Sequence, residues 1–360
     1  MRKVIYIVLA VIILSGCAAR EVKPPEKTVF YPALPLQPRI QFLVSIHSED
    51  DLEIKRSLEE FLLGQKKQTR KVIQRVYDVD SVRGKIYLVD RGYKRILIID
   101  LEKREIDLIR TGKNRAILDP AGLWVTEDDI KYVADMAKKQ IIVFDKNKEF
   151  VRAYGGPEVF GKPMDVAVFG NLIYVCDFAK HKIHVLNKKT GEIIREIGGM
   201  GIEPGKMYKP THISLDDEGF LYVNDSSNFR IQVFNKEGNF VKSIGSQGDV
   251  SGTFAMPKGI DIDRQKRLYA VDAAFENVQI FDVNTSDLLL FFGGSGPGTP
   301  GSMNLPAGMK IDYENVDYFQ KYTDKNFKIE YIVYICNMLG NKDLNIYGFG
   351  EWIGPPLSKR

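Results

Sequence analysis

The chain has 360 residues, 44% of them apolar, and its 51 basic and 47 acidic residues leave a net charge of +4. A chain of this size and apolar content can bury a large core. The near balance of charges, without a long basic block, argues against a nucleic-acid partner, because nucleic-acid-binding surfaces carry an excess of Lys and Arg.

The N-terminus has the pattern of an export signal. A positive start at residues 2–3 precedes a short apolar run over residues 4–14, which ends in the motif Leu14-Ser15-Gly16-Cys17. This motif resembles the lipobox of bacterial lipoproteins, where small residues admit a peptidase and the cysteine thiol is alkylated by a diacylglycerol. The resemblance implies a signal peptide over residues 1–16 and a lipid anchor, with acyl chains such as palmitate, on Cys17. The alternative is an ordinary secretory signal in which Cys17 has no role.

Residues 17–36 are polar and rich in proline, and we expect them to form a flexible tether between the lipid and the folded body. The lipoprotein resemblance implies attachment to a membrane of the bacterial cell envelope. Ala18, which follows the lipidated cysteine, favours the outer membrane, with the protein facing the periplasm or the cell surface. Cys176 and Cys336 lie in apolar runs and are expected to be buried, without a disulfide.

Two elements are predicted next. Residues 39–46 alternate like the last strand of a repeat unit. Residues 48–51 resemble a capping box, which opens a helix over about residues 51–63, and Gly64 would stop it. Its apolar residues fall largely on one face, so we expect it to dock on the body; a membrane-surface helix is the alternative.

A repeat then begins near residue 76. An aromatic-led run ends in an acid or amide six times, at separations of 45, 42, 48, 47 and 65 residues: Asp90, Asp135, Asp177, Asp225, Asp272 and Asn337. A repeat of this length is one supersecondary unit that buries its apolar faces by stacking on its neighbours. Alternation and Gly/Asp punctuation predict four strands in each unit. The terminal acids are expected to cap turns and are not assigned as catalytic residues.

The segment Asp225–Phe234, with a Gly-x-Leu-Tyr strand before it and a glycine-rich connection ending in proline after it, resembles the NHL repeat. The resemblance covers residues 76–350 and implies an all-β fold, a six-bladed β-propeller of four-stranded antiparallel blades over residues 37–360. Blade six lacks a fourth strand at its C-terminal end. We predict that residues 39–46 complete it, which closes the ring and removes an exposed edge.

Propellers of this kind direct the start of each first strand into a central channel. The residues at this position are Asp78, Gly122, Asp165, His212, Gly259 and Gly308. Two carboxylates and an imidazole, from Asp78, Asp165 and His212, could hold a divalent cation or a small polar ligand. The alternative is a hydrated pore. The NHL resemblance also includes a zinc lyase with several channel histidines, but one of the four histidines here falls at this position.

Blade six carries an insertion at about residues 313–329 that mixes aromatic and charged residues. Loops grafted on a rigid propeller commonly carry its function, so this insertion is a candidate surface for partner binding. Its aromatic residues are Tyr318, Phe319, Tyr322 and Phe327. The alternative is that they pack the insertion onto its own blade. The glycine-rich segment 293–298 is interpreted as an inter-blade turn, because no helix start follows it to bind phosphate.

The sequence contains no catalytic signature and no Cys-x-x-Cys-His motif for haem. It favours a non-catalytic, lipid-anchored propeller that binds another envelope protein or a peptide. A metal-assisted hydrolase or lyase that uses the channel mouth is one alternative, with a divalent cation as its cofactor. A structural spacer in an envelope export, surface or redox complex is another.

Overall fold

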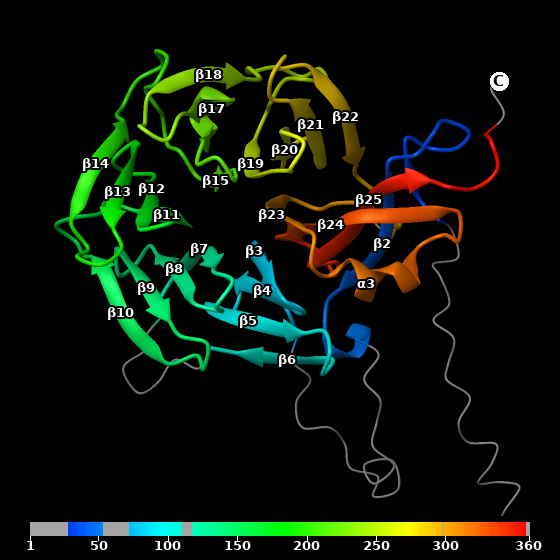
Figure 1. Cartoon of the computed structure of the whole chain (residues 1–360), viewed down its shortest axis with the longest axis horizontal. Coiled ribbons are helices and arrows are strands. Elements are labelled where there is room, and N and C mark those ends of the chain that lie inside the picture. Colours follow the sequence, from blue (N-terminus) through cyan, green and yellow to red (C-terminus); the bar gives the residue numbers. More distant parts are fainter. Residues whose placement is uncertain (1–27, 53–71, 110–116, 297, 358–360) are drawn as a thin grey trace, which may run out of the picture.

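The computed structural model describes residues 28–52, 72–109, 117–296 and 298–357. Six antiparallel sheets stand around a central axis, as the ring in Figure 1 shows. The predicted six-bladed propeller is therefore confirmed. The lipobox, Cys17 and most of the predicted helix over residues 51–63 lie outside the described residues. The start of that segment forms a 3-10 turn, η1 (Glu49–Leu52).

The first five blades each follow the chain from an inner to an outer strand. Blade one has β3 (Val76–Val82), β4 (Lys85–Asp90), β5 (Arg95–Asp100) and β6 (Glu105–Leu108). Blade two has β7 (Pro120–Val125), β8 (Lys131–Asp135), β9 (Gln140–Phe144) and β10 (Phe150–Gly155). Blade three has β11 (Pro163–Phe169), β12 (Leu172–Asp177), β13 (Lys182–Asn187) and β14 (Ile193–Gly198). Blade four has β15 (Ile213–Leu215), β16 (Leu221–Asp225), η2 (Ser226–Asn228), β17 (Arg230–Phe234) and β18 (Phe240–Ile244). Blade five has β19 (Pro257–Ile262), β20 (Arg267–Asp272), β21 (Asn277–Asp282) and β22 (Leu288–Gly293).

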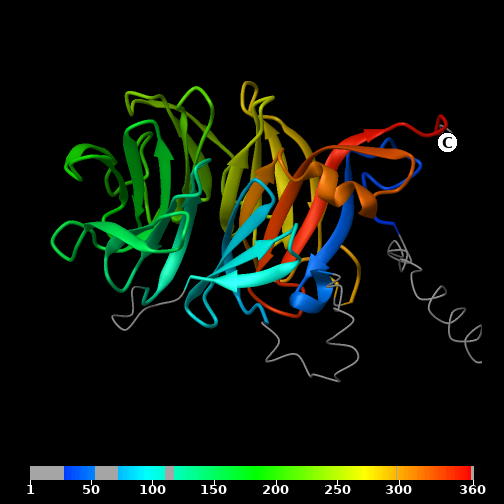
Figure 2. The ribbon, with the colours of Figure 1, turned by 60° about the horizontal axis from the view of Figure 1, so that its bottom comes forward.

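Blade six joins the two ends of the chain. Its strand order is β1-β2-β25-β24-β23, and its elements are β23 (Pro306–Asp312), α3 (Val316–Phe319), η3 (Gln320–Tyr322), β24 (Phe327–Asn337), β25 (Leu344–Trp352), β2 (Ile40–Ile46) and β1 (Phe30–Tyr31). β2 pairs antiparallel with β25, which confirms the predicted closing strand. Figures 1 and 2 both show β2 beside β25 where the ring closes. The additional strand β1 pairs with β2 inside the predicted tether, so the expected boundary at residue 36 is too late.

Apolar clusters fill the spaces between neighbouring blades, as stacking of the repeats requires. The cluster between blades six and one includes Leu43 and Ile46 of β2, so the closing strand also contributes core. Cys176 and Cys336 are buried and free, as expected. Within the described residues, no helix has the length and apolar character needed to cross a membrane.

The acids that end the second strands are fully buried and cap turns, as predicted. The carboxylate of Asp177 accepts hydrogen bonds from the backbone N–H groups of Gly161, Lys162, Ala179 and Lys180. Asp135 and Asp272 repeat this pattern in blades two and five. In blade six, the Asn337 oxygen accepts the N–H of Asn304 at 2.9 Å. In blades two to six this side chain thus joins the blade to the connection before it, whereas Asp90 of blade one binds Tyr93 and Arg95 of its own blade.

Candidate functional site

The first strands β3, β7, β11, β15, β19 and β23 lie closest to the axis of the ring (Figure 1). Because neighbouring strands are antiparallel, the inter-blade connections and the turns between second and third strands share one face of the ring. We call this the entrance face, since each first strand begins there. The other turns form the opposite face.

The three predicted channel residues come together. Asp78, Asp165 and His212 line one cavity on the axis, with a volume of about 30 Å³. About 10–15 Å³ of such space holds one water molecule, whereas sites for small-molecule ligands occupy about 300–1,000 Å³. The channel therefore has room for water but not for a substrate.

The channel aspartates are used to join blades. One Asp78 oxygen accepts the backbone N–H of Leu123 in blade two at 2.8 Å. Asp165 does the same for Ile213 in blade four, also at 2.8 Å. Both carboxylates thereby hold the first strand of the next blade, a role that the sequence alone did not reveal. The separations of 45 and 48 residues, close to the repeat length, were the available signal.

Glycines beside these aspartates allow neighbouring first strands to approach closely. A Cβ atom on Gly122 would lie 2.4 Å from the Cα atom of Asp165. On Gly308 it would lie 2.6 Å from the Cα atom of Asp78. Real Cβ atoms do not approach other carbons this closely, so these positions require glycine for close strand approach. The alternation of aspartate and glycine explains why the cavity is so small.

Burial determines the charge of the site. Burial and the neighbouring Asp165 raise the pKa of Asp78 well above its usual range. Burial raises the pKa of Asp165 to about 7, although its backbone hydrogen bonds act in the other direction. Burial, together with the charge of Lys258, lowers the pKa of His212 to about 3. The imidazole is thus neutral at neutral pH, and the two carboxyl groups retain protons more readily than free ones.

A second inward-facing layer lies two residues further along the first strands. Lys310 Nζ lies 3.4 Å from Asp80 Oδ1 and 3.8 Å from Asp261 Oδ2. It also lies 5.0 Å from the centre of the Trp124 ring. The Ser214 hydroxyl donates to Asp261 at 2.7 Å. Sequence reasoning missed this layer, although the two-residue period of a strand places it on the same face as the channel residues.

The metal hypothesis receives no geometric support from this arrangement. Each channel carboxylate already accepts a backbone N–H, and the second-layer carboxylates pair with Lys310. In the part of the chain that the structure describes, no three His, Cys, Asp or Glu side chains form a group that could hold a metal ion. Asp78, Asp165 and His212 share a cavity but not a coordination geometry.

We expect replacement of His212 by glutamine to flatten the acid side of the stability profile. The native imidazole stays neutral down to about pH 3, whereas in the unfolded chain it binds a proton below about pH 6.5. The unfolded state then holds more protons, so His212 makes the free energy of unfolding fall by about 1.4 kcal/mol per pH unit as the pH drops through this window. Above about pH 6.5 the imidazole is neutral in both the native and the unfolded state, so His212 then causes no loss of stability.

The measurement is urea unfolding of wild type and His212→Gln between pH 3 and 8. Asp165 acts in the opposite direction between about pH 4 and 7, and the difference between the two proteins removes its contribution. A difference that stays constant with pH would contradict a neutral, buried His212.

The blade-six insertion does not expose the predicted aromatic surface. Phe319, Tyr322 and Phe327 are 0%, 7% and 1% exposed, and Tyr318 is half-buried. The Phe319 ring lies 6.0 Å from the ring of Tyr334 on the same blade. The rings of these three residues therefore pack the insertion onto its own blade, and a role for the insertion in partner binding stays a prediction.

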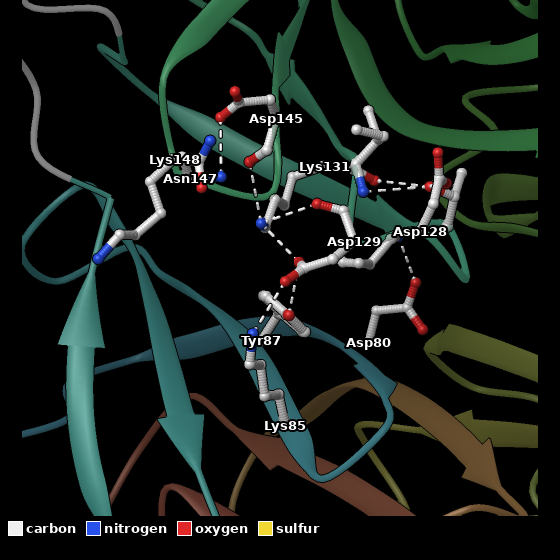
Figure 3. A network of polar contacts seen from close by, with 12 residues as sticks. Asp80, Lys85, Tyr87, Asp128, Asp129, Lys131, Asp145, Asn147 and Lys148 are labelled. Carbon is white, nitrogen blue, oxygen red and sulfur yellow. Dashed lines mark hydrogen bonds and ion pairs between the residues drawn. The ribbon is translucent and has the colours of Figure 1, made fainter.

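A larger cavity of about 320 Å³ lies on the opposite face between blades one and two. Its lining carries three cations and three anions: Arg83, Lys85, Lys146, Glu127, Asp128 and Asp129. Figure 3 shows the polar network beside it, in which Asp129 accepts hydrogen bonds from Tyr87 at 2.7 Å and Lys85 at 2.9 Å. Asp129 also pairs with the buried Lys131 at 2.5 Å. These charges satisfy one another across the blades, so we interpret this network as structural.

Comparisons with known proteins agree with the fold. A family model described as a 6-bladed beta-propeller matches residues 217–290. A structural genomics protein of unknown function from Bacteroides thetaiotaomicron is 18% identical with a TM-score of 0.57, over 79% of this chain and 71% of that one. A gluconolactonase from Xanthomonas campestris is 17% identical with a TM-score of 0.54, over 91% and 99%. Virginiamycin B lyase from Staphylococcus aureus is 16% identical with a TM-score of 0.50, over 77% and 85%. No curated protein matches the sequence. At these identities the structural matches indicate a common fold and nothing more.

Proposed function

We propose that this chain is a lipid-anchored, non-catalytic propeller of NHL type, located in the bacterial cell envelope, that binds another envelope protein or a peptide on its entrance face. The observation that carries the proposal is the closed channel. A cavity of about 30 Å³ excludes a substrate, and the channel carboxylates are engaged by backbone N–H groups. A rigid scaffold whose central channel is closed by its own described residues is suited to recognition.

The entrance face supports this proposal because it exposes apolar side chains. Met200 and Ile202, in the connection before blade four, are 69% and 75% exposed, and Val250, before blade five, is 62% exposed. Tyr93, Leu118, Met256 and Leu339 are also exposed on turns and connections of this face. Both connections are held by short β-bridges, so their apolar side chains project from a fixed backbone. Exposed apolar residues on an ordered surface are typical of binding sites.

The lipid anchor is tested with Cys17→Ser in the full-length chain. We expect wild type to incorporate a clickable palmitate analogue and to sediment with membranes, and we expect the variant to lose both properties, because the thiol is the atom that is alkylated. Wild-type protein that takes up no label would overturn the anchor and leave the question of the binding face unaffected.

The binding face is tested by co-isolation from cross-linked, solubilised envelopes. We expect Ile202→Asp together with Val250→Asp to abolish recovery of the wild-type partner, because a charge on each connection must be desolvated on binding. The matched control is Phe291→Asp, which changes an exposed residue on the outer strand β22. Equal recovery with every variant would favour the structural spacer over this proposal, and failure to recover any reproducible partner with wild type would contradict it.

A further inference from the structure

Four cationic side chains from four blades lie at the entrance of the channel. Arg91 follows β4, and Lys162 directly precedes β11 of blade three. Lys209 lies in the connection before β15 of blade four, and Lys258 lies in β19. All four are half-buried, so none extends freely into water. We call them the entrance cations.

Ring contacts place these cations close to the channel residues. The Arg91 guanidinium lies 5.0 Å from the centre of the Tyr77 ring, and Tyr77 stacks on His212 with ring centres 5.4 Å apart. The ammonium groups of Lys162 and Lys209 lie 5.0 Å and 5.7 Å from the ring of Phe178, which packs against the apolar cluster that contains Tyr77. The entrance is therefore both cationic and aromatic.

The entrance cations form few ion pairs. Within the described residues, the ammonium groups of Lys162, Lys209 and Lys258 form no ion pair, and Arg91 contacts one carboxylate, that of Asp119, at 3.5 Å. Burial and the charge of Arg91 lower the pKa of Lys258, although the charge of Asp272 acts in the other direction. Like charges brought together in a partly desolvated site repel each other, and a bound anion would relieve that repulsion.

A buried hydrogen-bonding atom beside these cations has no partner. His212 is 3% exposed, and its Nε2 atom makes no hydrogen bond with any described residue. Its Nδ1 atom lies 3.1 Å from the Thr211 hydroxyl, which itself accepts a hydrogen bond from the Asn224 amide. The Thr211 proton is thus free to bind Nδ1, and this tautomer leaves Nε2–H as a donor. An unsatisfied buried donor next to cations favours an anionic ligand.

We propose that the channel entrance binds a carboxylate group, held by the entrance cations and by the His212 Nε2–H donor. The half-buried rings of Phe178 and Tyr208 provide contacts for the organic part of the ligand, which favours an organic anion over an inorganic one. The cavity of about 30 Å³ beneath the entrance limits how far the ligand penetrates. The carboxylate comes either from an acidic peptide segment or from a free organic acid. This inference rests on the proposed function and names the chemistry of its ligand.

The proposal is tested by fluorescence anisotropy of labelled hexaglutamate with the purified full-length chain in detergent. The entrance variant carries Lys162→Gln, Lys209→Gln and Lys258→Gln. The matched control carries Lys103→Gln, Lys189→Gln and Lys236→Gln, three substitutions on turns of the opposite face that give the same change in net charge. We expect the entrance variant to lose affinity by at least about tenfold, the loss of about one charge-assisted hydrogen bond, and the control to stay within about twofold.

Competition identifies the source of the carboxylate. Citrate that displaces the peptide better than sodium chloride of equal ionic strength supports the site and assigns it to a free organic acid. Displacement by unlabelled hexaglutamate but not by citrate supports the site and assigns it to a peptide. Equal displacement by sodium chloride, equal losses in the two triple variants, or no binding by wild type would overturn the proposal.

Two controls separate loss of binding from loss of folding, and this proposal from the proposed function. If the entrance variant melts several degrees below its control, the single substitution Lys209→Gln replaces it, with an expected loss of about threefold, and Lys236→Gln serves as its control. Because the assay uses pure protein, its failure leaves the partner face defined by Ile202 and Val250 untouched. Conversely, failure to recover a cellular partner would not change the affinity of the purified chain for hexaglutamate.

Discussion

Gly122→Ala is expected to lower the free energy of unfolding by about 4 kcal/mol or more, the range reached when a core contact cannot relax. The added Cβ atom would lie 2.4 Å from the Cα atom of Asp165 and 2.3 Å from a carboxylate oxygen of the same residue. Backbone is involved on both sides, so neither side chain can move away to make room. The adjacent first strands must separate, which also breaks the hydrogen bond between Asp165 and Ile213 of blade four.

The matched control is Gly170→Ala, at a turn where a Cβ atom has no neighbour within 4 Å. Its φ of +57° is unfavourable for alanine, so we expect a loss of about 1–2 kcal/mol. Urea unfolding of the two variants compares close packing with backbone strain directly. Similar losses in both variants would show that the first strands are not packed as tightly as described.

Asp129→Asn is expected to cost about 3 kcal/mol, because it leaves the buried charge of Lys131 without its nearest counter-ion. Lys131 is 1% exposed, and its ammonium group lies 2.5 Å from Asp129 Oδ1. Figure 3 shows the two side chains pointing toward each other. The same carboxylate accepts the Tyr87 hydroxyl of blade one at 2.7 Å. Asparagine tolerates the φ of +62° at this position, so the loss reports on charge and not on backbone strain.

The control for this prediction is the double variant Asp129→Asn with Lys131→Met, which removes both charges and retains the apolar length of the side chain. We expect it to recover most of the lost free energy, measured by urea unfolding, because no uncompensated charge remains. A double variant as unstable as the single one would mean that the pair does not act through its charges. The neighbouring Asp128→Asn, at an exposed position, should change stability by less than about 0.5 kcal/mol.

The sequence predicted the ring because its signals are local and repeated. The strand alternation recurs in every blade, and five blades carry a Tyr-x-x-Asp end whose acid caps a turn, with Asn337 in the same place in blade six. The closing strand was also predictable, since residues 39–46 match a fourth strand where blade six lacks one. Strand β1 was not, because Phe30 and Tyr31 are two residues among prolines and contain no alternation from which to recognise a strand.

The candidate site was predicted only in part, because its chemistry depends on neighbours in other blades. Asp78 and Asp165 have the composition of a ligand set, but the backbone N–H groups that they accept lie 45 and 48 residues away. In the same way, Phe319 belongs to a polar insertion in the sequence yet is buried against its own blade. The entrance cations, from four separate blades, share no local motif. The residue types indicated which atoms could bind a ligand, but the arrangement of the blades determined which groups those atoms contact.

The most direct test of the proposed function is site-specific photo-crosslinking in intact cells. A photoreactive amino acid replaces Ile202 on the entrance face, and in a parallel strain it replaces Phe291 on the outer strand β22. Both side chains are exposed, at 75% and 51%, so the two probes have comparable access to neighbouring proteins. We expect a discrete protein adduct from position 202 and none from position 291. Adducts from position 291 alone, equal adducts from both positions, or none from position 202 would contradict recognition through the entrance face.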